Sequence, residues 1–180
     1  MVNPVMCPEE FESRPVRGGD LYQGAHNFVL DLNNQDQIEE LIGSLINSNP
    51  DELATLLIAW VVAWEGVSNS VVLAKDLQLI GTGLGQQDRR GATKLAISRA
   101  TDAGHDITGA MFGSDGFFPF AKAPEDSDLL EATQLLVNNG CAGGVVPADG
   151  KRWPEVHQFM KERRQQVVAL KADYRGFAKH

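Results

Sequence analysis

Apolar and polar positions follow a helical period in the first part of the chain. From Gln35 onward, apolar residues return at a spacing of three or four, while the two glutamates between them face away. This spacing predicts an amphipathic helix, which we expect to end at Asn47. The apolar positions of this predicted helix are Ile38, Leu41, Ile42, Leu45 and Ile46.

A second helix, predicted from Pro50 to Glu65, has a strong start signal. Asn49 can accept a backbone hydrogen bond as N-cap, proline suits the first helical position, and acidic residues follow in the first turn. The body of this helix is apolar nearly all round. We therefore expect it to pack on two sides, against a sheet and against another helix or a subunit.

Short aliphatic runs then alternate with helical patterns to the end of the chain. The predicted strands are 70–74 and 78–82, which pair as a hairpin, and 108–112, 144–146 and 167–170. The predicted helices are one ending before Gly104, one from Asp126 or Ser127 to Asn139, and one from Pro154 to about Gln165. This order predicts an α/β fold, a three-layer sandwich with one mixed β-sheet.

The opening segment, residues 1–34, is rich in Pro, Gly and Asn, which predicts a loosely structured lead-in or an edge hairpin. Its extended candidates are residues 14–16 and 21–23, on either side of a turn at Gly18. Residues 35–180 are expected to form one domain, since a domain typically takes about 100 to 200 residues.

Charge and composition narrow the range of partners. The formal net charge is -8 and the pI is about 4.9, so we expect no broad surface for nucleic acid or anionic lipid. The net charge does not exclude a local basic pocket that binds one phosphate. Cys7 and Cys141 lie far apart and indicate neither a disulfide framework nor a zinc site, which fits a reducing cytoplasm. We expect no secretory signal, and the apolar run from Leu53 to Trp64 is too short to cross a bilayer.

The stretch Gly81-Thr-Gly-Leu-Gly85 is the first candidate for chemistry. Such a loop between a strand and a helix can hold an anion, but it lacks the last glycine of GxGxxG and the ending of a P-loop. A plain tight connection is the alternative. Arg89 and Arg90 follow at the next helix start, where cations oppose the helix dipole. They indicate either an anionic partner or surface pairing with Asp88 or another acid.

The aromatic loop Gly113-Ser-Asp-Gly-Phe-Phe-Pro-Phe120 is the second candidate. Its phenylalanines, Phe117, Phe118 and Phe120, can stack a planar heterocycle, or they can plug the core, which we expect of one or two of them. Asn69, where the apolar helix passes into a strand, can orient a carboxamide or a carbonyl, or it is an ordinary turn residue.

The histidines give no sign of a metal site or a catalytic triad. The chain has His26, His105, His157 and His180, scattered without the spacing of metal ligands. We expect them on the surface, with His157 solvated. The sequence carries no zinc-deaminase motif, and no Ser-His-Asp or Cys-His set can be placed from spacing.

Taken in order, these motifs resemble the aminoimidazole carboxamide ribonucleotide (AICAR) transformylase family, the C-terminal part of bifunctional purine-synthesis enzymes that also carry IMP cyclohydrolase. The matching segments are Arg14-Pro-Val-Arg-Gly-Gly19, Trp60, Ser68-Asn-Ser-Val-Val-Leu-Ala-Lys75, Gly81-Thr-Gly-Leu-Gly-Gln-Gln-Asp-Arg89, Ser114-Asp-Gly-Phe-Phe-Pro-Phe120 and Arg175-Gly-Phe-Ala-Lys-His180. The resemblance implies the second of two cytidine-deaminase-like halves, working in a dimer with active sites at the interface.

The resemblance also implies formyl transfer from 10-formyltetrahydrofolate, as co-substrate, to the amine of AICAR. Asn69 is the residue implied to be catalytic. The residues implied to bind the nucleotide are Asn69, Arg89, Phe117, Phe120, Arg175 and His180. Those implied to bind the folate co-substrate are Arg89, Arg90, Phe120 and Gly150.

The chain departs from the family pattern at several points. The family's catalytic Lys-His pair lies in the preceding half, so a second copy or a separately encoded partner is expected to supply it. The other departures are Val61 and Val67 in place of basic residues, Ala121-Lys122 in place of Arg-Asp, and Pro147-Ala-Asp-Gly150 in place of a Pro-Gly-Gly-Ser-like loop. Three hypotheses stay open: a transformylase subunit, a non-catalytic nucleotide-binding or regulatory homologue, and a structural dimer partner.

Overall fold

A six-stranded sheet forms the centre of the computed structural model, which describes residues 11–24, 29–44 and 49–176. Its strands are β3 (Ile38–Ile42), β4 (Val71–Lys75), β5 (Gln78–Gly83), β6 (Met111–Ser114), β7 (Gly143–Pro147) and β8 (Gln166–Leu170). They lie in the order β3-β8-β7-β6-β4-β5. The β6-β7 and β7-β8 pairs are parallel and the other pairs antiparallel, which confirms the predicted mixed sheet.

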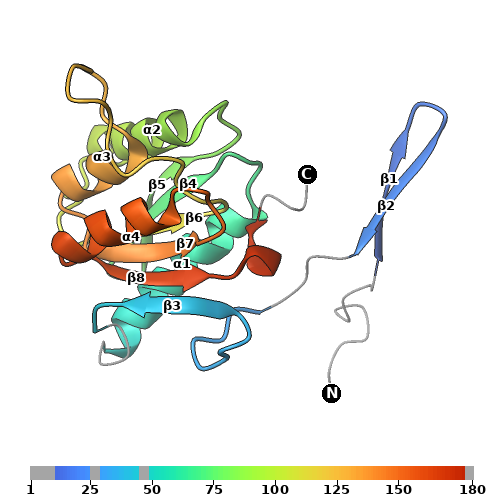
Figure 1. The fold of residues 1–180 in the computed structure, drawn as a ribbon, viewed down its shortest axis with the longest axis horizontal. Helices are drawn as coiled ribbons and strands as arrows, with labels where there is room; N and C mark the ends of the chain where they lie inside the picture. Colours follow the sequence, from blue (N-terminus) through green and yellow to red (C-terminus); the bar gives the residue numbers. More distant parts are fainter. Residues whose placement is uncertain (1–10, 25–28, 45–48, 177–180) are drawn as a thin grey trace.

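Helices cover both faces of this sheet, so the fold has the three predicted layers (Figure 1). The helix α1 (Pro50–Glu65) packs on one face, where Leu56 and Trp60 meet Val145 and Val168. The helices on the other face are α2 (Arg89–Asp102), α3 (Ala132–Asn138) and α4 (Trp153–Glu162). The α/β class predicted from the sequence is therefore confirmed.

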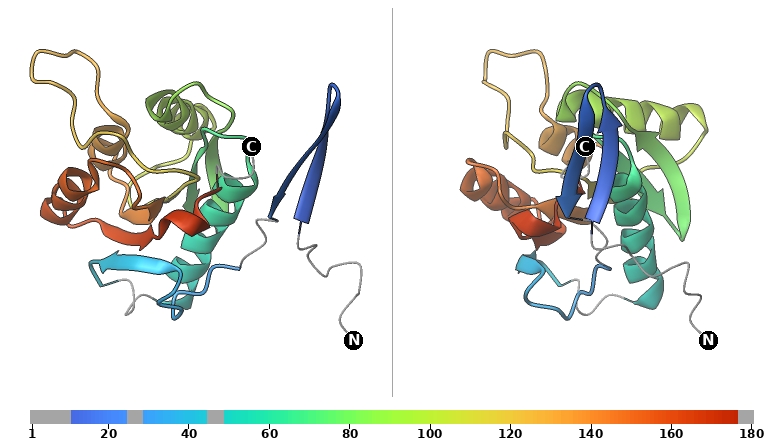
Figure 2. Two further views of the ribbon diagram at one scale, coloured as in Figure 1. Left: turned by 45° about the vertical axis from the view of Figure 1, so that its right-hand side comes forward. Right: turned by 90° about the vertical axis from the view of Figure 1, so that its right-hand side faces the viewer.

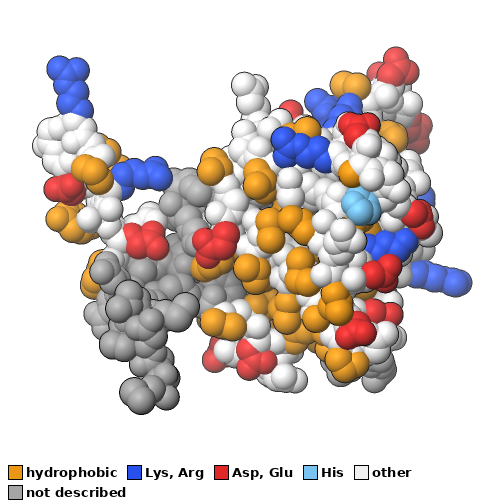
Figure 3. All heavy atoms as spheres, turned by 180° about the vertical axis from the view of Figure 1, so that it is seen from behind, with side chains coloured by type: hydrophobic (Ala, Val, Ile, Leu, Met, Phe, Trp, Pro, Cys, Tyr) orange, Lys and Arg blue, Asp and Glu red, His pale blue; other side chains and the backbone are white. Residues whose placement is uncertain are grey.

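The start of α1 forms as predicted, because the Asn49 side chain accepts a hydrogen bond from the backbone N–H of Glu52 at 2.9 Å. Only one side of α1 is covered by the described part of the chain. Val61 on its outer side is 51% exposed, and Val67 just beyond its end is exposed as well. Figure 3 shows apolar side chains gathered on this rear face of the molecule. A covering subunit therefore stays a prediction.

The helix predicted from Gln35 is wrong, because residues 38–42 form the edge strand β3, paired antiparallel with β8. A register shift between Ile38 and Glu40 explains the misleading spacing. The extra residue of a bulge brings Ile38 and Leu41 to one face of the sheet, against the α1 side, and turns Ile42 to the other face. A spacing of three thus mimics a helix here. Residues 45–48 lie outside the described residues.

The helix predicted to start at Asp126 or Ser127 starts later, since α3 begins at Ala132. Its N-cap is Glu131, whose side chain forms a capping box with Gln134, and Gln134 Oε1 also accepts from the Ala123 backbone at 2.8 Å. The Glu131 and Gln134 pair is visible in the sequence, but Asp126 and Ser127 come first along the chain and also suit an N-cap. The last helix, α4, also ends earlier than predicted, at Glu162.

The predicted N-terminal hairpin is present as β1 (Phe11–Val16) and β2 (Gly19–Gly24), with Gly18 at a φ of 94° in the turn. These strands form a separate two-stranded sheet instead of an edge of the main sheet. Figures 1 and 2 show the hairpin standing clear of the body. Apolar side chains are exposed on it, including Phe11, Leu21 and Tyr22.

Candidate functional site

Three of the predicted site residues line one hollow, which we call the Asn69 hollow. Its volume is about 440 Å³, and its lining is Ser68, Asn69, Gln87, Asp88, Arg89, Phe117 and Pro119. These residues come from three separate segments: the connection from α1 to β4, the start of α2, and the loop after β6. The sheet order places β4 directly beside both β5 and β6, which brings the three segments together.

Asn69 is held against the turn that precedes α2. Its side-chain Nδ2 donates to the Gln86 carbonyl at 3.0 Å, and the backbones of Asn69 and Gln86 exchange two hydrogen bonds at 3.1 and 3.2 Å. Oδ1 of Asn69 accepts no hydrogen bond within the described residues. The side chain is thus fixed through its amide nitrogen, while its oxygen remains available as an acceptor at the hollow.

Arg89 forms a buried ion pair with Asp115, a residue that sequence reasoning did not single out. The Arg89 side chain is 6% exposed and that of Asp115 is 0% exposed. Arg89 also donates to the Ser70 carbonyl at 2.9 Å, and Asp115 accepts from the Ser70 backbone N–H at 2.6 Å. Of the alternatives open for Arg89, the structure shows pairing with an acid other than Asp88, but the pair is buried and does not lie at the surface. An arginine at a helix start was the available signal, since it needs a nearby acid to offset the dipole.

Two polar atoms of this ion pair have no hydrogen-bond partner in the described structure, although both are buried. They are Nε of Arg89 and Oδ2 of Asp115. Burying an unsatisfied polar atom costs about 1–3 kcal/mol. The buried pair therefore carries unmet hydrogen-bonding capacity at the start of α2.

Two glycines of the Gly81 to Gly85 stretch are explained by packing, and the third, Gly85, has a φ of 65°. A Cβ at Gly83 would lie 1.8 Å from the Ala92 carbonyl oxygen, and one at Gly81 would lie 2.2 Å from that of Ala96. At these two positions the strand β5 and the helix α2 thus approach too closely for a side chain. Asp88 caps the helix by accepting from Gly91 N–H at 2.6 Å. These features match the alternative that the stretch is a tight connection between a strand and a helix.

The phenylalanines of the aromatic loop divide between the core and the surface. Phe118 is buried with its ring centroid 5.8 Å from that of Phe112, so the expectation of a core role holds for it. Phe117 is half-buried and lines the Asn69 hollow. Phe120 is exposed and lies under the Arg152 guanidinium, at 5.1 Å from the ring centroid, beside Lys122 in another hollow. The structure does not bring Phe120 together with Asn69.

Gly150, Arg175 and Arg90 do not line the Asn69 hollow. A Cβ at Gly150 would lie 2.8 Å from the Phe117 ring, so this glycine packs on that side chain. The C-terminal segment reaches the same region, because Gly176 N–H donates to the Asp115 carbonyl at 2.7 Å. Arg175 next to it forms an ion pair with Asp149 at 2.6 Å. Arg90 is half-buried and has no ion pair with another described residue.

His180 lies outside the described residues, as do Cys7 and His26. His157 does not match the expectation of a solvated side chain, because its Nε2 lies 3.0 Å from Glu40 Oε1 and only a fifth of the side chain is exposed.

Burial raises the pKa of the Cys141 thiol to about 12. Within the described ranges, no group of His, Cys, Asp or Glu is arranged to hold a metal ion.

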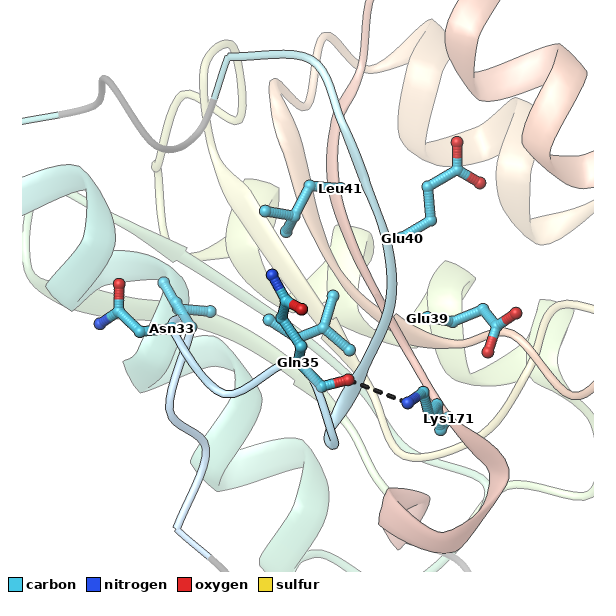
Figure 4. A pocket seen from close by; sticks show the side chains of 8 residues that line it. Asn33, Gln35, Glu39, Glu40, Leu41 and Lys171 are labelled. Carbon is cyan, nitrogen blue, oxygen red and sulfur yellow. Dashed lines mark hydrogen bonds between the residues drawn. The ribbon is translucent and has the colours of Figure 1, made fainter.

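A second hollow, of about 600 Å³, opens beside the edge strand β3 (Figure 4). Lys171 donates from its Nζ to the Gln35 carbonyl at 2.9 Å across one end, and Glu39 and Glu40 stand on the strand. None of the predicted site residues lines it. The Asn69 hollow is smaller, but it gathers the residues that carry the chemistry. No helix in the described segments is long and apolar enough to cross a membrane.

Comparison with known proteins identifies a family for this chain. Residues 2–99 match the family model described as AICARFT/IMPCHase bienzyme, which is more than half of the chain. Similar proteins named "Bifunctional purine biosynthesis protein PurH" include one from Nostoc sp., 38% identical over 107 residues, covering 59% of this chain and 20% of that protein. Another, from Neisseria gonorrhoeae, is 32% identical over 152 residues, covering 84% of this chain and 26% of that protein. The chain thus spans about a quarter of the length of such relatives.

Among solved structures, one similar chain is a diaminohydroxyphosphoribosylaminopyrimidine deaminase/5-amino-6-(5-phosphoribosylamino)uracil reductase from Thermotoga maritima. The TM-score is 0.46 and the sequence identity 20%, with 66% of this chain and 36% of that chain covered. A likeness at this level carries no inference about activity.

Proposed function

We propose, on the premise that the chain belongs to the AICARFT/IMPCHase bienzyme family, that it acts in purine biosynthesis as the second half of an AICAR transformylase. In this function the Asn69 hollow receives the carboxamide nucleotide, and 10-formyltetrahydrofolate is the co-substrate. A partner half supplies the Lys-His pair for proton transfer. The observation that carries the proposal is the convergence of Asn69, Arg89 and Phe117 on one hollow.

The chemistry of the lining supports an aminoimidazole carboxamide as the ligand. The half-buried Phe117 ring offers a flat apolar face for a planar heterocycle. Among the described residues, Asn69 keeps an available acceptor oxygen, because its nitrogen is the atom bonded to the Gln86 carbonyl. That oxygen can accept a hydrogen bond from an N–H of the carboxamide or of the reacting amine and thereby fix the ligand's orientation.

In the proposed reaction, the amine of AICAR attacks the formyl carbon carried on N10 of the folate. A C–N bond forms to the amine, the bond from the formyl carbon to N10 breaks, and the amine proton passes to N10 through the partner's Lys-His pair. The described residues of this chain do not move the proton in this scheme. Their part is to position the amine, through Asn69, and to shape the pocket, through Phe117 and the Arg89–Asp115 pair.

Folate binding is assigned to the outer rim of the site. Arg90 follows Arg89 at the start of α2, and Gly150 packs on the Phe117 ring. Phe120 lies with Lys122 and Arg152 around a separate space of about 340 Å³. The cationic residues there suit an anionic part of the co-substrate. Because Phe120 is separated from Asn69, this assignment is tested apart from nucleotide binding.

Calorimetric titration of the chain with AICAR tests nucleotide binding. We expect saturable binding that is weakened about tenfold by Asn69→Ala, the loss that one hydrogen bond of about 1.4 kcal/mol would cause. The matched control is Asn139→Ala, since Asn139 also bonds a backbone carbonyl, that of Leu135 at 2.8 Å, but lies at the end of α3 and does not line the hollow. Equal weakening in both variants would contradict the assignment.

Turnover separates transformylase from cyclohydrolase activity. We expect formyl-AICAR to form only when the chain is mixed with a Lys-His-bearing half, and we expect no conversion of formyl-AICAR to IMP by this chain in the same assay. Cyclisation of formyl-AICAR by the chain alone would contradict the proposed activity and assign the other activity of the family.

A second candidate function is a non-catalytic nucleotide-binding homologue. It is favoured by the state of the site's arginines, since Arg89 is paired with Asp115 and Arg175 with Asp149. Under this function, AICAR binds but no formyl-AICAR forms in any mixture with a Lys-His half.

A further inference from the structure

We infer that the β1-β2 hairpin is a docking arm, which packs the face that carries Phe11 and Tyr22 on the outer α1 surface of a second copy of this chain. The outer α1 surface is the set of apolar residues at α1 and its C-terminal end that the described structure leaves exposed or half-buried. Its members are Ile58, Val61, Val62, Val67 and Leu84. This contact is independent of the ligand that occupies the Asn69 hollow.

The hairpin has no hydrophobic core of its own. Figures 1 and 2 show it clear of the body, and its two strands form a sheet separate from the main one. Phe11 and Tyr22 on it are 65% and 73% exposed. A two-stranded sheet is marginally stable at best in water unless a hydrophobic face is packed against something else. The exposed aromatic side chains therefore indicate that another surface covers the hairpin.

The two faces of the hairpin differ in character. Because successive side chains of a strand point to opposite faces, the register places Phe11 and Tyr22 on one face, where the only charged residue is Asp20 beside the turn. The residues on the other face are Glu12, Arg14, Val16, Leu21 and Gln23. Aromatic residues are enriched and charged residues depleted at the core of protein interfaces. The face with Phe11 and Tyr22 is therefore the docking face.

The outer α1 surface is a suitable acceptor for this face. Ile58, Val61 and Val62 recur at helical spacing, so they form one stripe along α1. Leu84 extends the stripe at the end of the helix, since a Cβ at Gly66 would lie 2.8 Å from its Cδ2. Figure 3 shows the apolar side chains that gather on this rear face. An apolar patch of this kind is typical of a contact with another protein.

The hairpin and the helix also agree in length. The helix α1 has 16 residues and is therefore about 24 Å long, while the six-residue strands of the hairpin extend about 20 Å. A hairpin laid along α1 would place the helix between two sheets, the main sheet on one side and the hairpin on the other. This arrangement explains why the helix is apolar nearly all round.

A second copy is the occupant that covers both surfaces at once. Each chain has one docking face and one acceptor, so two copies that exchange hairpins bury both contacts in a closed two-fold dimer. Within one chain, the hairpin stands apart from α1 (Figure 2). The net charge of -8 opposes association of two copies, so the contact has to be apolar, as both of these surfaces are.

Sedimentation velocity of the whole chain and of lysine variants tests this contact. We expect the unsubstituted chain to be a dimer. Tyr22→Lys and Val61→Lys should each raise the dimer dissociation constant more than about tenfold, because each buries an unpaired charge in an apolar contact. The matched control is Gln23→Lys, which adds the same charge beside Glu12 on the opposite face of the hairpin and should stay dimeric.

Mixing two variants distinguishes an exchanged hairpin from a contact between two α1 helices. A mixed dimer keeps one intact contact, between the hairpin of the Val61→Lys chain and the α1 helix of the Tyr22→Lys chain. We expect dimers to reappear in an equimolar mixture at concentrations where each variant alone is monomeric. A monomeric unsubstituted chain, a dimer that Tyr22→Lys leaves unchanged, or a mixture that stays monomeric would overturn the inference.

Cysteine cross-linking locates the contact without a lysine that could weaken the hairpin itself. In a Cys7→Ser background, a short bifunctional maleimide should join a Tyr22→Cys chain to an isotope-labelled Val61→Cys chain. Cys141 is buried and does not compete. A Gln23→Cys chain is the control and should give much less of the mixed product. Equal products from Tyr22→Cys and Gln23→Cys would overturn the assignment of the docking face.

Discussion

The Arg89 guanidinium and the Asp115 carboxylate form an ion pair that is closed off from solvent, at the point where the start of α2 meets the end of β6. The Asp115 carboxylate also accepts a hydrogen bond from the Ser70 backbone N–H, and the Asp115 backbone carbonyl accepts one from Gly176 N–H. One buried acid thus ties together the segments that surround the Asn69 hollow.

Removing one partner of this pair should destabilise the fold strongly. We expect Asp115→Ala to lower the free energy of unfolding by about 3–5 kcal/mol, because it leaves the Arg89 charge buried without a counter-ion. The double variant Arg89→Met/Asp115→Leu should lose less than the sum of the single losses, since neither charge remains. Urea unfolding of Arg89→Met, Asp115→Leu and the double variant measures this comparison, and strictly additive losses would show that the two residues do not act as a pair.

The close approach of β5 and α2 predicts a sharp response to one methyl group. Gly83→Ala places a Cβ on the Ala92 carbonyl, so we expect a loss of about 1–3 kcal/mol from forced backbone movement. Gly19→Ala is the control, because a Cβ there meets nothing within 4 Å and should change stability by less than about 0.5 kcal/mol. Thermal unfolding of both variants measures the difference, and a stable Gly83→Ala protein would contradict the packing.

The Cys141 thiol predicts a dependence of stability on alkaline pH. Its folded pKa is about 12, above the unfolded value of about 8.5, so the folded state keeps a proton that the unfolded state releases. Its contribution is fully present below about pH 8.5 and is lost as the pH rises towards 12. Cys141→Ala should flatten this part of the stability profile. An unchanged slope in urea unfolding between these pH values would refute the assignment.

The uncovered outer side of α1 predicts a partner there. Val61 is 51% exposed on an otherwise apolar helix, and we expect Val61→Lys to leave the folded monomer intact while it separates the copies of an assembled chain. Sedimentation velocity before and after the substitution measures this. An unchanged sedimentation coefficient for an assembled protein would place the subunit contact elsewhere.

Sequence patterns predicted most elements of the fold, and the exceptions have physical causes. The α1 helix has its own capping residues, and the β4-β5 hairpin has β-branched runs, so the local sequence was enough to predict both elements. The local sequence was not enough to predict the strand β3, because its bulge gives Ile38 and Leu41 a helix-like spacing that only pairing with β8 resolves. Tertiary pairing determined the structure of that segment.

Three residues of the candidate hollow could be named from the sequence, but their geometry could not. The order of motifs indicated Asn69, Arg89 and Phe117, which the fold gathers at one hollow. The buried partner of Arg89 and the acid on Arg175 were not predicted, since Asp115 and Asp149 lie 26 residues away along the chain from the arginines they bind. Local sequence indicates that an arginine at a helix start needs an acid, but it does not identify an acid so far along the chain.

Binding of AICAR to the chain and to Asn69→Ala is the measurement that tests the central claim most directly. We expect micromolar binding to the unsubstituted chain, about tenfold weaker binding to Asn69→Ala, and unchanged binding to Asn139→Ala. Failure of the folded chain to bind AICAR, or equal binding by Asn69→Ala, would show that the Asn69 hollow is not the nucleotide site.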